Sequence, residues 1–390
     1  ASLSKIFTTI SENIGSANID LSSSTVVKDI VTPYFTMPAN TADVKLYTAD
    51  YNGKSFGMEQ PAGSDVRATI DAKTNTVSVT GFDFNKYYVA DKQHEGTYGK
   101  KLIIEFSVQR KPGFVGGNNV PTNGDTSGVY TEKGVSAGLF DVPKVNVPII
   151  APELAGQDCH VYYLGTQPTP EQMCTPYDTA GSDFSFVKVS YTTSGSVDMT
   201  QDGSYTVTAT VSPQEEAASD SAGASAQPAT ATATSNVYVY KPELTFKDSE
   251  GYYGDTAPGF DGNLTATVWK HGETEANTAV MGEAPELTLT YTPDADAIVD
   301  GKINTRTDFG VDVTVKIDNT DVTGKTAFLH TNCAGKTCVP PADKEFLVHV
   351  NTCSLTISKT VTGQNNGQSF VFTVKDANGN VITTVAVKGG

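Results

Sequence analysis

Residue types that build catalytic and metal centres are scarce in this sequence. Its 390 residues include five cysteines, five histidines and one tryptophan. No Cys-x-x-Cys pair occurs, and no histidine lies at metal-ligand spacing from a cysteine, which excludes the common zinc-site patterns. The sequence also contains no phosphate-binding loop and no dinucleotide fingerprint. We therefore expect a chain that is not an enzyme and that holds no metal or cofactor.

Long hydrophobic stretches are absent as well. No apolar run approaches the ~20 residues that a membrane-spanning helix needs, so we expect no direct membrane insertion. The sequence has neither a signal peptide at residue 1 nor a cell-wall sorting signal at its end. Its first residues, ASLSKIFTTISENIG, look like the last helix of a preceding domain, and its last residues stop within a β-pattern. We therefore expect a fragment of a longer protein.

Basic residues are also few compared with acidic residues. The 27 Lys and Arg residues face 44 Asp and Glu residues, which gives a formal net charge of −17. Such an acidic chain is a poor partner for nucleic acids and for anionic membrane surfaces. A Thr-rich acidic surface is typical of secreted proteins, so we expect an extracellular location.

The pattern of the chain is that of β-structure. A helical pattern occurs in residues 3–14 and ends at Gly15. From about residue 22 onward, short segments rich in Thr, Val and Tyr alternate in polarity and are bounded by turn residues. The length exceeds what one core supports. We predict an all-β chain of tandem immunoglobulin-like sandwiches with one short N-terminal helix.

Turn-rich breaks divide the chain into modules. The expected boundaries are 1–21 for the helix, 22–150 for a first sandwich, 151–241 for an immunoglobulin-like second, 242–352 for a third, and 353–390 for the first half of a further domain. The stretch GFVGGNNVPTNGDTSGVY in the first sandwich predicts a long loop. In the second, SPQEEAASDSAGASAQPATATAT is poor in large apolar residues, which predicts a mobile loop at a hairpin tip.

One lysine lies where an apolar residue is expected. Lys359 shares a face with Leu355, Ile357 and Val361 in an alternating segment. A buried ammonium costs several kcal/mol, so it must be paired, deprotonated or consumed by a reaction. The alternative is a lysine whose stem lies on the core while its head reaches water.

The sequence around Lys359 has a family resemblance. LTISKTVTG, followed by FVFTVKDANGN, resembles the opening of the collagen-adhesin B-type domain of Gram-positive pilins and adhesins. The resemblance implies that Lys359 forms an isopeptide bond with an asparagine of the last strand, with a buried Glu or Asp shuttling protons. Both partners would lie beyond Gly390, so this bond is not expected within the present chain.

A weaker resemblance covers the N-terminal part. STVVKDIVTPYF, GFDFNKYYV, GKKLIIEFSVQRKPGFVGGNNVPTN and VNVPI are similar to the region after a von Willebrand factor A domain in surface adhesins and pilus proteins of gut Firmicutes. This implies that residues 1–21 are the remnant of that domain. The metal motif Asp-x-Ser-x-Ser is absent, so no metal site is implied. The resemblance also implies a protein anchored to the bacterial cell wall.

Two further isopeptide sites are candidates in the sequence. In the third sandwich, Lys247 lies on the first strand, Asn351 on the last, and Glu286 begins a middle strand, although Lys247 is expected to face away from the core. In the first sandwich, Lys28 and the closing-strand residue Asn146 are candidates, with Asp29 as the acid. Lys28 and Asp29 are expected to point to opposite faces of their strand, so surface lysines are the alternative in both cases.

The cysteines predict disulfides, because they fit no metal pattern in a chain expected outside the cell. Cys159 and Cys174 flank a Gln- and Pro-rich segment that a bridge would staple. Cys333 and Cys338 flank AGKT and form the second candidate pair, and Cys353 could replace either of them. The alternative is free buried thiols.

The sequence favours two functional hypotheses over an enzyme. No histidine (His94, His160, His271, His330 or His349) has a recognisable Ser, Cys or carboxylate partner, so an enzyme ranks last. The first hypothesis is a fragment of a bacterial surface adhesin or pilus-type stalk, locked by disulfides and isopeptide bonds. The second is a module that binds a host surface or secreted protein, such as an immunoglobulin or a matrix protein. The tyrosines of NKYYV, VYYL and GYYG are candidate contacts for such a partner.

Overall fold

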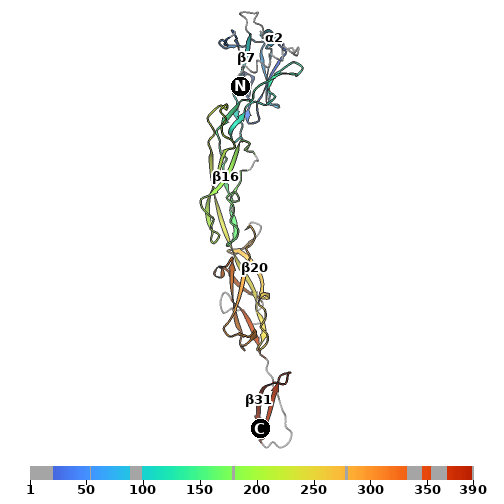
Figure 1. The fold of residues 1–390 in the computed structure, drawn as a ribbon, viewed down its shortest axis with the longest axis vertical. Coiled ribbons are helices and arrows are strands. Elements are labelled where there is room, and N and C mark those ends of the chain that lie inside the picture. The colour runs from blue at the N-terminus through green and yellow to red at the C-terminus, as the bar shows by residue number, and fades with distance from the viewer. Residues whose placement is uncertain are drawn as a thin grey trace. The chain divides into compact units, whose positions relative to one another are not determined.

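The computed structural model describes residues 21–52, 54–87, 99–177, 181–276, 280–331, 345–352 and 367–388. Within these ranges, helix is limited to α2 (Phe84–Tyr87) and three short 3-10 segments, η1 (Thr41–Asp43), η2 (Asp261–Asn263) and η3 (Thr323–Lys325). Strands make up the remaining regular structure (Figure 1). The prediction of an all-β, immunoglobulin-like architecture is confirmed, and the expected N-terminal helix lies outside the described residues.

The chain forms two compact units. Unit 1 comprises Ala1–Pro242 and Val268–Glu286, and unit 2 comprises Glu243–Thr267 and Leu287–Gly390. The two sandwiches expected for residues 22–241 therefore belong to one unit. Residues 268–286, which the sequence assigned to the third sandwich, also belong to unit 1. One reason is that β22 (Val280–Met281) pairs in parallel with β14 (Cys159–Tyr162).

The first sandwich of unit 1 is built around a five-stranded sheet. Its strands, in spatial order, are β11 (Ser136–Leu139), β10 (Gly128–Tyr130), β1 (Val26–Ile30), β6 (Thr76–Thr80) and β5 (Arg67–Asp71). A three-stranded sheet consists of β4 (Gln60–Pro61), β3 (Lys45–Asp50) and β7 (Lys100–Glu105). The remaining pairs are β2 (Phe35–Thr36) with β8 (Gln109–Arg110), and β9 (Gly117–Pro121) with β12 (Lys144–Val147).

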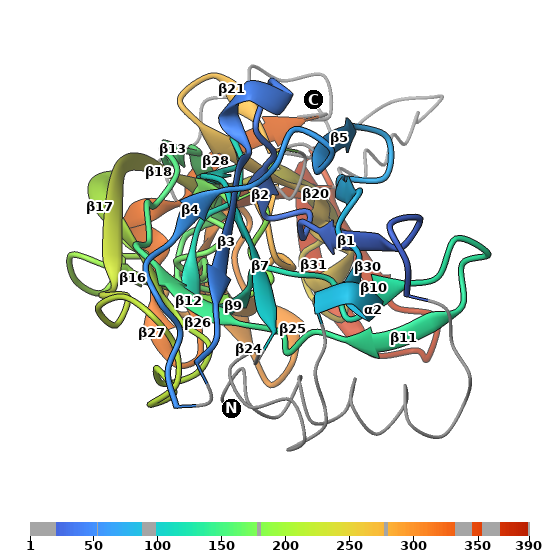
Figure 2. The same ribbon diagram turned by 90° about the horizontal axis from the view of Figure 1, so that it is seen from above.

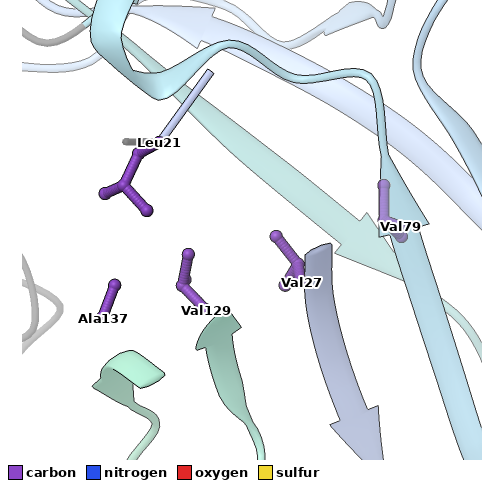
Figure 3. Packing of buried hydrophobic residues seen from close by; sticks show 5 residues of the cluster. All are labelled: Leu21, Val27, Val79, Val129 and Ala137. Carbon is purple, nitrogen blue, oxygen red and sulfur yellow. The ribbon is translucent and has the colours of Figure 1, made fainter. Parts of the chain in front are cut away.

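A compact apolar cluster holds this sandwich together. Leu21, Val27, Val79, Val129 and Ala137 point toward one another and are almost fully buried (Figure 3). Side chains of β3 and β7 pack against them. The alternation of apolar and polar residues along β6 (TVSVT) places Val77 and Val79 on one face, because successive strand side chains point to opposite sides.

The prediction of a long loop at residues 113–130 is wrong. This stretch contains β9, which pairs with β12, and β10, which lies between β1 and β11 (Figure 2). The glycines and asparagines that indicated a loop are tolerated because the chain needs unusual backbone angles here. Gly116 and Gly117 have φ values of 111° and 136°, and Asn119 has a φ of 60°.

The second sandwich of unit 1 contains the longest strands. Its main sheet has the order β16 (Val187–Thr193), β17 (Gly203–Pro213), β18 (Ala229–Lys247), β14 and β22, and β20 (Leu264–His271) pairs with both β18 and β21 (Thr274–Glu275). A small pair joins β13 (Ala155–Gly156) to β15 (Cys174–Thr175). Every second residue of β17 from Val207 to Val211 is fully buried, which identifies the core face.

Unit 2 is a further sandwich. Residues 243–247 of β18 pair in parallel with β28 (Ala327–Thr331). A second sheet contains β19 (Ser249–Tyr252), β29 (Glu345–Asn351), β26 (Phe309–Ile317), β23 (Thr288–Pro293) and β27 (Thr320–Asp321). The pair β24 (Ile298–Val299) and β25 (Lys302–Ile303) and the hairpin β30 (Ser369–Lys375) and β31 (Val381–Lys388) complete the described strands.

In the core of unit 2, buried and more exposed residues alternate along β26 from Val311 onward. Phe309, Val311, Val313, Val315 and Ile317 of β26 are buried, and their intervening neighbours from Asp312 onward are more exposed. This pattern was visible in the sequence as GVDVTVKI. It fixes the strand register, since a shift by one residue would expose the whole apolar set.

Candidate functional site

Hydrogen bonds and apolar packing join the two sandwiches of unit 1. The junction involves β9 and β12 of the first sandwich and the β17–β18 connection of the second. The connection folds back so that Ala222 forms a parallel bridge to Val145 of β12. Ala222 N donates to Lys144 O at 2.9 Å, and Asn146 N donates to Ala222 O at 2.8 Å. The connection therefore extends the β9–β12 pair by one short strand.

Asn118 anchors the two ends of this connection. Its side-chain oxygen accepts a hydrogen bond from Ala226 N at 2.8 Å, and its Nδ2 donates to Glu215 O at 3.0 Å. Asn118 is only 3% exposed. A buried carboxamide is stable only when its donors and acceptors are satisfied, and here the satisfying groups all come from the other sandwich.

Asn119 holds the middle of the connection. Its Oδ1 accepts from Ala218 N and from Ser221 Oγ, both at 2.8 Å, and its Nδ2 donates to Glu216 O at 2.8 Å. The left-handed backbone of Asn119 turns the adjacent Asn118 and Asn119 side chains toward the same segment. Asparagine adopts this conformation more readily than other non-glycine residues.

Asn146 closes the arrangement from β12. Its Oδ1 accepts from Asn119 N at 3.1 Å, and its Nδ2 donates to Gly223 O at 3.1 Å. The three asparagines together, which we call the asparagine clamp, use both ends of each carboxamide. Each net hydrogen bond contributes roughly 1 kcal/mol, so the clamp stabilises the junction by several kcal/mol.

Apolar packing continues through the same junction. The ring of Phe186, just before β16, lies 4.9 Å from Tyr34 and 6.1 Å from Phe114 of the first sandwich. A neighbouring cluster contains Val115 and Ile149 of the first sandwich and Val187, Val211 and Ala226 of the second. Apolar side chains of both sandwiches therefore form one buried cluster at the junction.

Gly117 allows the backbone of β9 to lie close to Phe186. A Cβ added at Gly117 would lie 2.5 Å from the Cβ of Phe186 and 2.7 Å from its carbonyl oxygen. The backbone of β9 can therefore approach Phe186 only because residue 117 has no side chain.

The prediction of a low-complexity loop at the hairpin tip is confirmed for residues 214–228, whereas residues 229–234 belong to β18. The segment does connect β17 and β18, as expected, but the asparagine clamp fixes it. Composition indicated disorder because the segment buries little apolar surface by itself. Its backbone is satisfied by residues roughly 100 positions away, which local composition does not reveal. The GGNN run was the available signal, but glycine and asparagine are equally typical of loops.

The structure does not bring Lys28 and Asn146 together. The Lys28 ammonium lies 4.8 Å from the centre of the Tyr130 ring. The Asn146 carboxamide is engaged in the clamp, in the sheet formed by β9 and β12. Asp29 faces the core side of β1 together with Val27, and its buried Oδ1 has no hydrogen-bond partner. Burial raises the pKa of Asp29 to about 6.

The candidates of the third sandwich lie on the surface. Lys247 is exposed, while Leu244 and Phe246 are fully buried, as the alternation predicted. Asn351 and Glu286 are also exposed, and the Asn351 Nδ2 lies 3.5 Å from the Glu250 Oε2. The geometry therefore matches a surface lysine at position 247. Lys359 lies outside the described residues.

The predicted bridge between Cys159 and Cys174 is not formed in the structure, in which both residues are free, buried thiols. The Cys159 Sγ lies 3.6 Å from Gln172 O, and the Cys174 Sγ lies 3.6 Å from Pro170 O. Burial is the main cause that raises the pKa of both thiols. Cys333, Cys338 and Cys353 lie outside the described residues.

Contrary to the expectation from the sequence, three histidines have carboxylate partners. In unit 2, His349 is 4% exposed and lies between Asp308, with Nδ1 to Oδ2 at 3.0 Å, and Asp248, with Nε2 to Oδ2 at 3.3 Å. His330 Nδ1 is 3.7 Å from the other oxygen of Asp248. In unit 1, His271 pairs with Asp202. Sequence separation of 41 to 101 residues hid the pairs of His349.

The tyrosines predicted as contacts for a partner protein differ in exposure. Tyr163 of VYYL is buried, so it offers no contact surface, whereas Tyr252 and Tyr253 of GYYG are 48% and 47% exposed.

Within the described ranges, no group of three His, Cys, Asp or Glu residues could hold a metal ion. In the same part of the chain, no helix has the length and apolarity to cross a membrane.

Comparison with known proteins adds little. No family model matches the chain, and no curated protein matches it. Among solved structures, the chain is similar to titin domains I67–I69 in an E-to-A variant, with 11% identity over 85% of this chain and 93% of that one, and a TM-score of 0.13. It is also similar to zebrafish RET cadherin-like domains 1 to 4, with 8% identity over 83% and 71% and the same TM-score. Similarities this distant carry no functional argument.

Proposed function

We propose that this chain is a segment of an extracellular, non-catalytic stalk of a bacterial surface adhesin or pilus-type protein. The observation that carries the proposal is the asparagine clamp. Asn118, Asn119 and Asn146 join two sandwiches that the sequence presents as separate modules. A stalk has to keep neighbouring modules from bending and separating under load, and this junction provides that resistance.

The chemistry of the clamp suits a load along the chain. Its hydrogen bonds lie side by side along the β17–β18 connection, so a separating force is shared among them. Phe186 packs on Tyr34 and Phe114 beside the clamp. Water competes for exposed hydrogen bonds, so we expect the buried Asn118–Ala226 bond to last longer than the exposed bonds of Asn119 to Glu216 and of Asn146 to Gly223.

Covalent cross-links belong to the same proposal. For Lys359, Cys333, Cys338 and Cys353 the support comes from the sequence alone. A bond between the first and last strands of a domain places a covalent path along the line of pull. The intact mass of the full-length protein tests this point, because each Lys–Asn bond removes one ammonia, and this loss persists after reduction.

Single-molecule force spectroscopy of the whole chain tests the stalk proposal. We expect the two sandwiches of unit 1 to resist force together, and Asn119→Ala to lower the force of their first unfolding event. Gln227→Ala is the matched control, because Gln227 lies on the same connection but is exposed. Two independent low-force events in the unaltered chain, or equal traces for the two variants, would contradict the proposal.

Binding of a host protein is the second candidate function, and one observation favours it. Tyr252 and Tyr253 are exposed, and the Arg306 guanidinium lies 4.7 Å from the centre of the Tyr253 ring. Tyr and Arg are enriched among the residues that dominate protein interfaces. Biolayer interferometry against immunoglobulin and matrix proteins tests it: Tyr253→Ala should weaken binding, and binding that is unchanged by this variant would exclude the patch.

A further inference from the structure

Four titratable side chains meet where the two sheets of unit 2 join. His330 lies on β28, which pairs with residues 243–247 of β18, and His349 lies on β29, which pairs with β19 and β26. Asp248 lies between β18 and β19, where the chain passes from one sheet to the other. The side chains of Asp248, His349 and His330 are 2%, 4% and 6% exposed. We call these three residues and Asp308 the histidine cluster.

Asp248 is fixed in place from several directions. Its Oδ1 accepts a hydrogen bond from Leu347 N at 2.9 Å. Asn263 is 5% exposed, and its Nδ2 donates to Lys247 O at 2.6 Å and to Ser249 Oγ at 2.7 Å. These bonds hold the backbone on both sides of Asp248, so they restrict movement of its carboxylate.

Both ring nitrogens of His349 face carboxylate oxygens. Nδ1 lies 3.0 Å from Asp308 Oδ2, and Nε2 lies 3.3 Å from Asp248 Oδ2. An ionised carboxylate only accepts hydrogen bonds, and a neutral imidazole has one N–H donor, so a neutral ring would place a lone pair against an oxygen. A doubly protonated ring donates from both nitrogens. The geometry therefore favours an imidazolium at this position.

His330 is placed differently, although it also faces Asp248. Its Nδ1 lies 3.7 Å from Asp248 Oδ1, and its buried Nε2 has no hydrogen-bond partner among the described residues. An imidazolium here would carry a buried N–H without an acceptor, and an unsatisfied charged group costs more than an unsatisfied neutral one. A neutral ring with its proton on Nδ1 avoids that cost. The cluster therefore contains one charged and one neutral histidine.

The charged groups next to the cluster are exposed. Glu250 lies opposite His349 in the pairing of β19 with β29, but its side chain is exposed to solvent. Lys247, which precedes the buried aspartate, is exposed as well. Water screens both charges more effectively than those inside the cluster. Among the described residues, the two aspartates therefore dominate the electrostatic surroundings of the His349 ring.

We propose that His349 is held as a buried imidazolium between Asp248 and Asp308, and that this arrangement is a pH-dependent lock between the two sheets of unit 2. Loss of one ring proton to the solvent leaves a nitrogen lone pair against a carboxylate oxygen. The lock is therefore closed at neutral pH and weakens as the pH rises. This inference goes beyond the stalk role and does not depend on it.

Nuclear magnetic resonance of the whole chain with isotope-labelled histidine tests the charge state. We expect both nitrogens of His349 to carry protons at pH 7.5, and His330 to carry one proton, on Nδ1. The signals are assigned from their loss in His349→Gln and His330→Gln. A singly protonated His349 ring at this pH would overturn the proposal, and would place the missing proton on an aspartate.

Hydrogen-exchange mass spectrometry measures the lock. After correction for the intrinsic pH dependence of exchange, the protection of β29 should fall about tenfold between pH 6 and pH 9, because one hydrogen bond to a charged group is lost. In Asp308→Asn, a carboxamide replaces one of the two carboxylates, so the fall should be smaller.

Asp318→Asn provides the matched control. Asp318 is an exposed residue of unit 2 outside the histidine cluster, so its replacement changes the net charge equally. This variant should show the same fall as the unaltered chain. Equal falls in Asp308→Asn and Asp318→Asn would overturn the proposal, as would protection of β29 that does not decrease with pH in the unaltered chain.

Discussion

The side-chain oxygen of Asn118 accepts a hydrogen bond from the backbone of Ala226 at 2.8 Å, across 108 positions of sequence. One residue belongs to the first sandwich of unit 1, and the other belongs to the connection between two strands of the second. This contact fixes a segment whose composition is that of a disordered linker. It also makes the two sandwiches one unit.

Removal of this contact should release the connection. In Asn118→Ala, the buried Ala226 N–H loses its acceptor, which costs about 1–3 kcal/mol. Hydrogen-exchange mass spectrometry should show faster exchange in residues 214–226 and unchanged exchange in β16. Gln227→Ala should leave both segments as they are. Rapid exchange of residues 214–226 in the unaltered chain would contradict the described junction.

Gly117→Ala should damage the same junction by steric conflict. The new methyl group would collide with the backbone and Cβ of Phe186, and a φ of 136° is unfavourable for alanine. Thermal unfolding should show a loss of about 2–4 kcal/mol. Gly195→Ala is the control, because nothing lies within 4 Å of its added Cβ and its φ is not positive. Equal stabilities of the two variants would rule out the close approach.

Asp29 should make unit 1 less stable as the pH rises. Its pKa is about 6 in the folded state, above the ordinary value of 3.8, because burial disfavours its charge. The stabilisation from the neutral form is complete below pH 4 and is lost as the pH rises through 6. This shift corresponds to roughly 3 kcal/mol at 1.36 kcal/mol per pKa unit.

Denaturant unfolding at pH 4 and pH 8 measures this dependence. The carboxamide introduced by Asp29→Asn cannot ionise, so this variant should lose less stability than the parent between these pH values. Asp43→Asn, at an exposed position, should follow the parent. A parent and an Asp29→Asn variant with the same pH dependence would show that Asp29 does not ionise within the core.

Cys159 and Cys174 should react with iodoacetamide only after denaturation. Both are buried, and the raised pKa of each thiol lowers the fraction of reactive thiolate. Peptide mass mapping of native and denatured protein distinguishes these states. Purified protein that carries a disulfide between these two residues, and therefore never reacts without reductant, would reinstate the bridge expected from the sequence.

His349→Ala should destabilise unit 2 strongly. The change leaves the buried carboxylate of Asp248 without one of its close partners, and an unsatisfied buried polar group costs about 1–3 kcal/mol. His271→Ala removes an equivalent contact with Asp202, but this pair is 36% and 52% exposed. Exposed pairs contribute about 0–1 kcal/mol. Equal losses in the two variants would indicate that burial of the His349 network has no energetic consequence.

The sequence predicted the elements of this chain well where burial repeats with the period of a strand. Val311, Val313 and Val315 alternate with polar residues, so their strand and its inward face follow from the pattern alone. The outward position of Lys247 follows from its neighbours Leu244 and Phe246 in the same way. Each of these inferences needs only the geometry of one strand.

The contacts that define the candidate sites were not predictable in this way. Asn118 and Asn119 looked like loop residues because glycine and asparagine are typical of turns. The Asp248 partner of His349 could not be identified, since any of many carboxylates could have been its neighbour. Partner choice between distant positions depends on how strands are ordered in a sheet, and local sequence does not encode that order.

The sequence by itself determined the class of this protein: an acidic all-β chain of tandem sandwiches, with register set by alternating apolar residues. Only the tertiary structure decided that the first two sandwiches form one unit, that a low-complexity segment is fixed between them, and that His349 lies between Asp248 and Asp308. The physical reason is the range of the forces involved. Hydrophobic periodicity acts along one strand, whereas a buried hydrogen bond depends on two groups that meet only after the chain has folded.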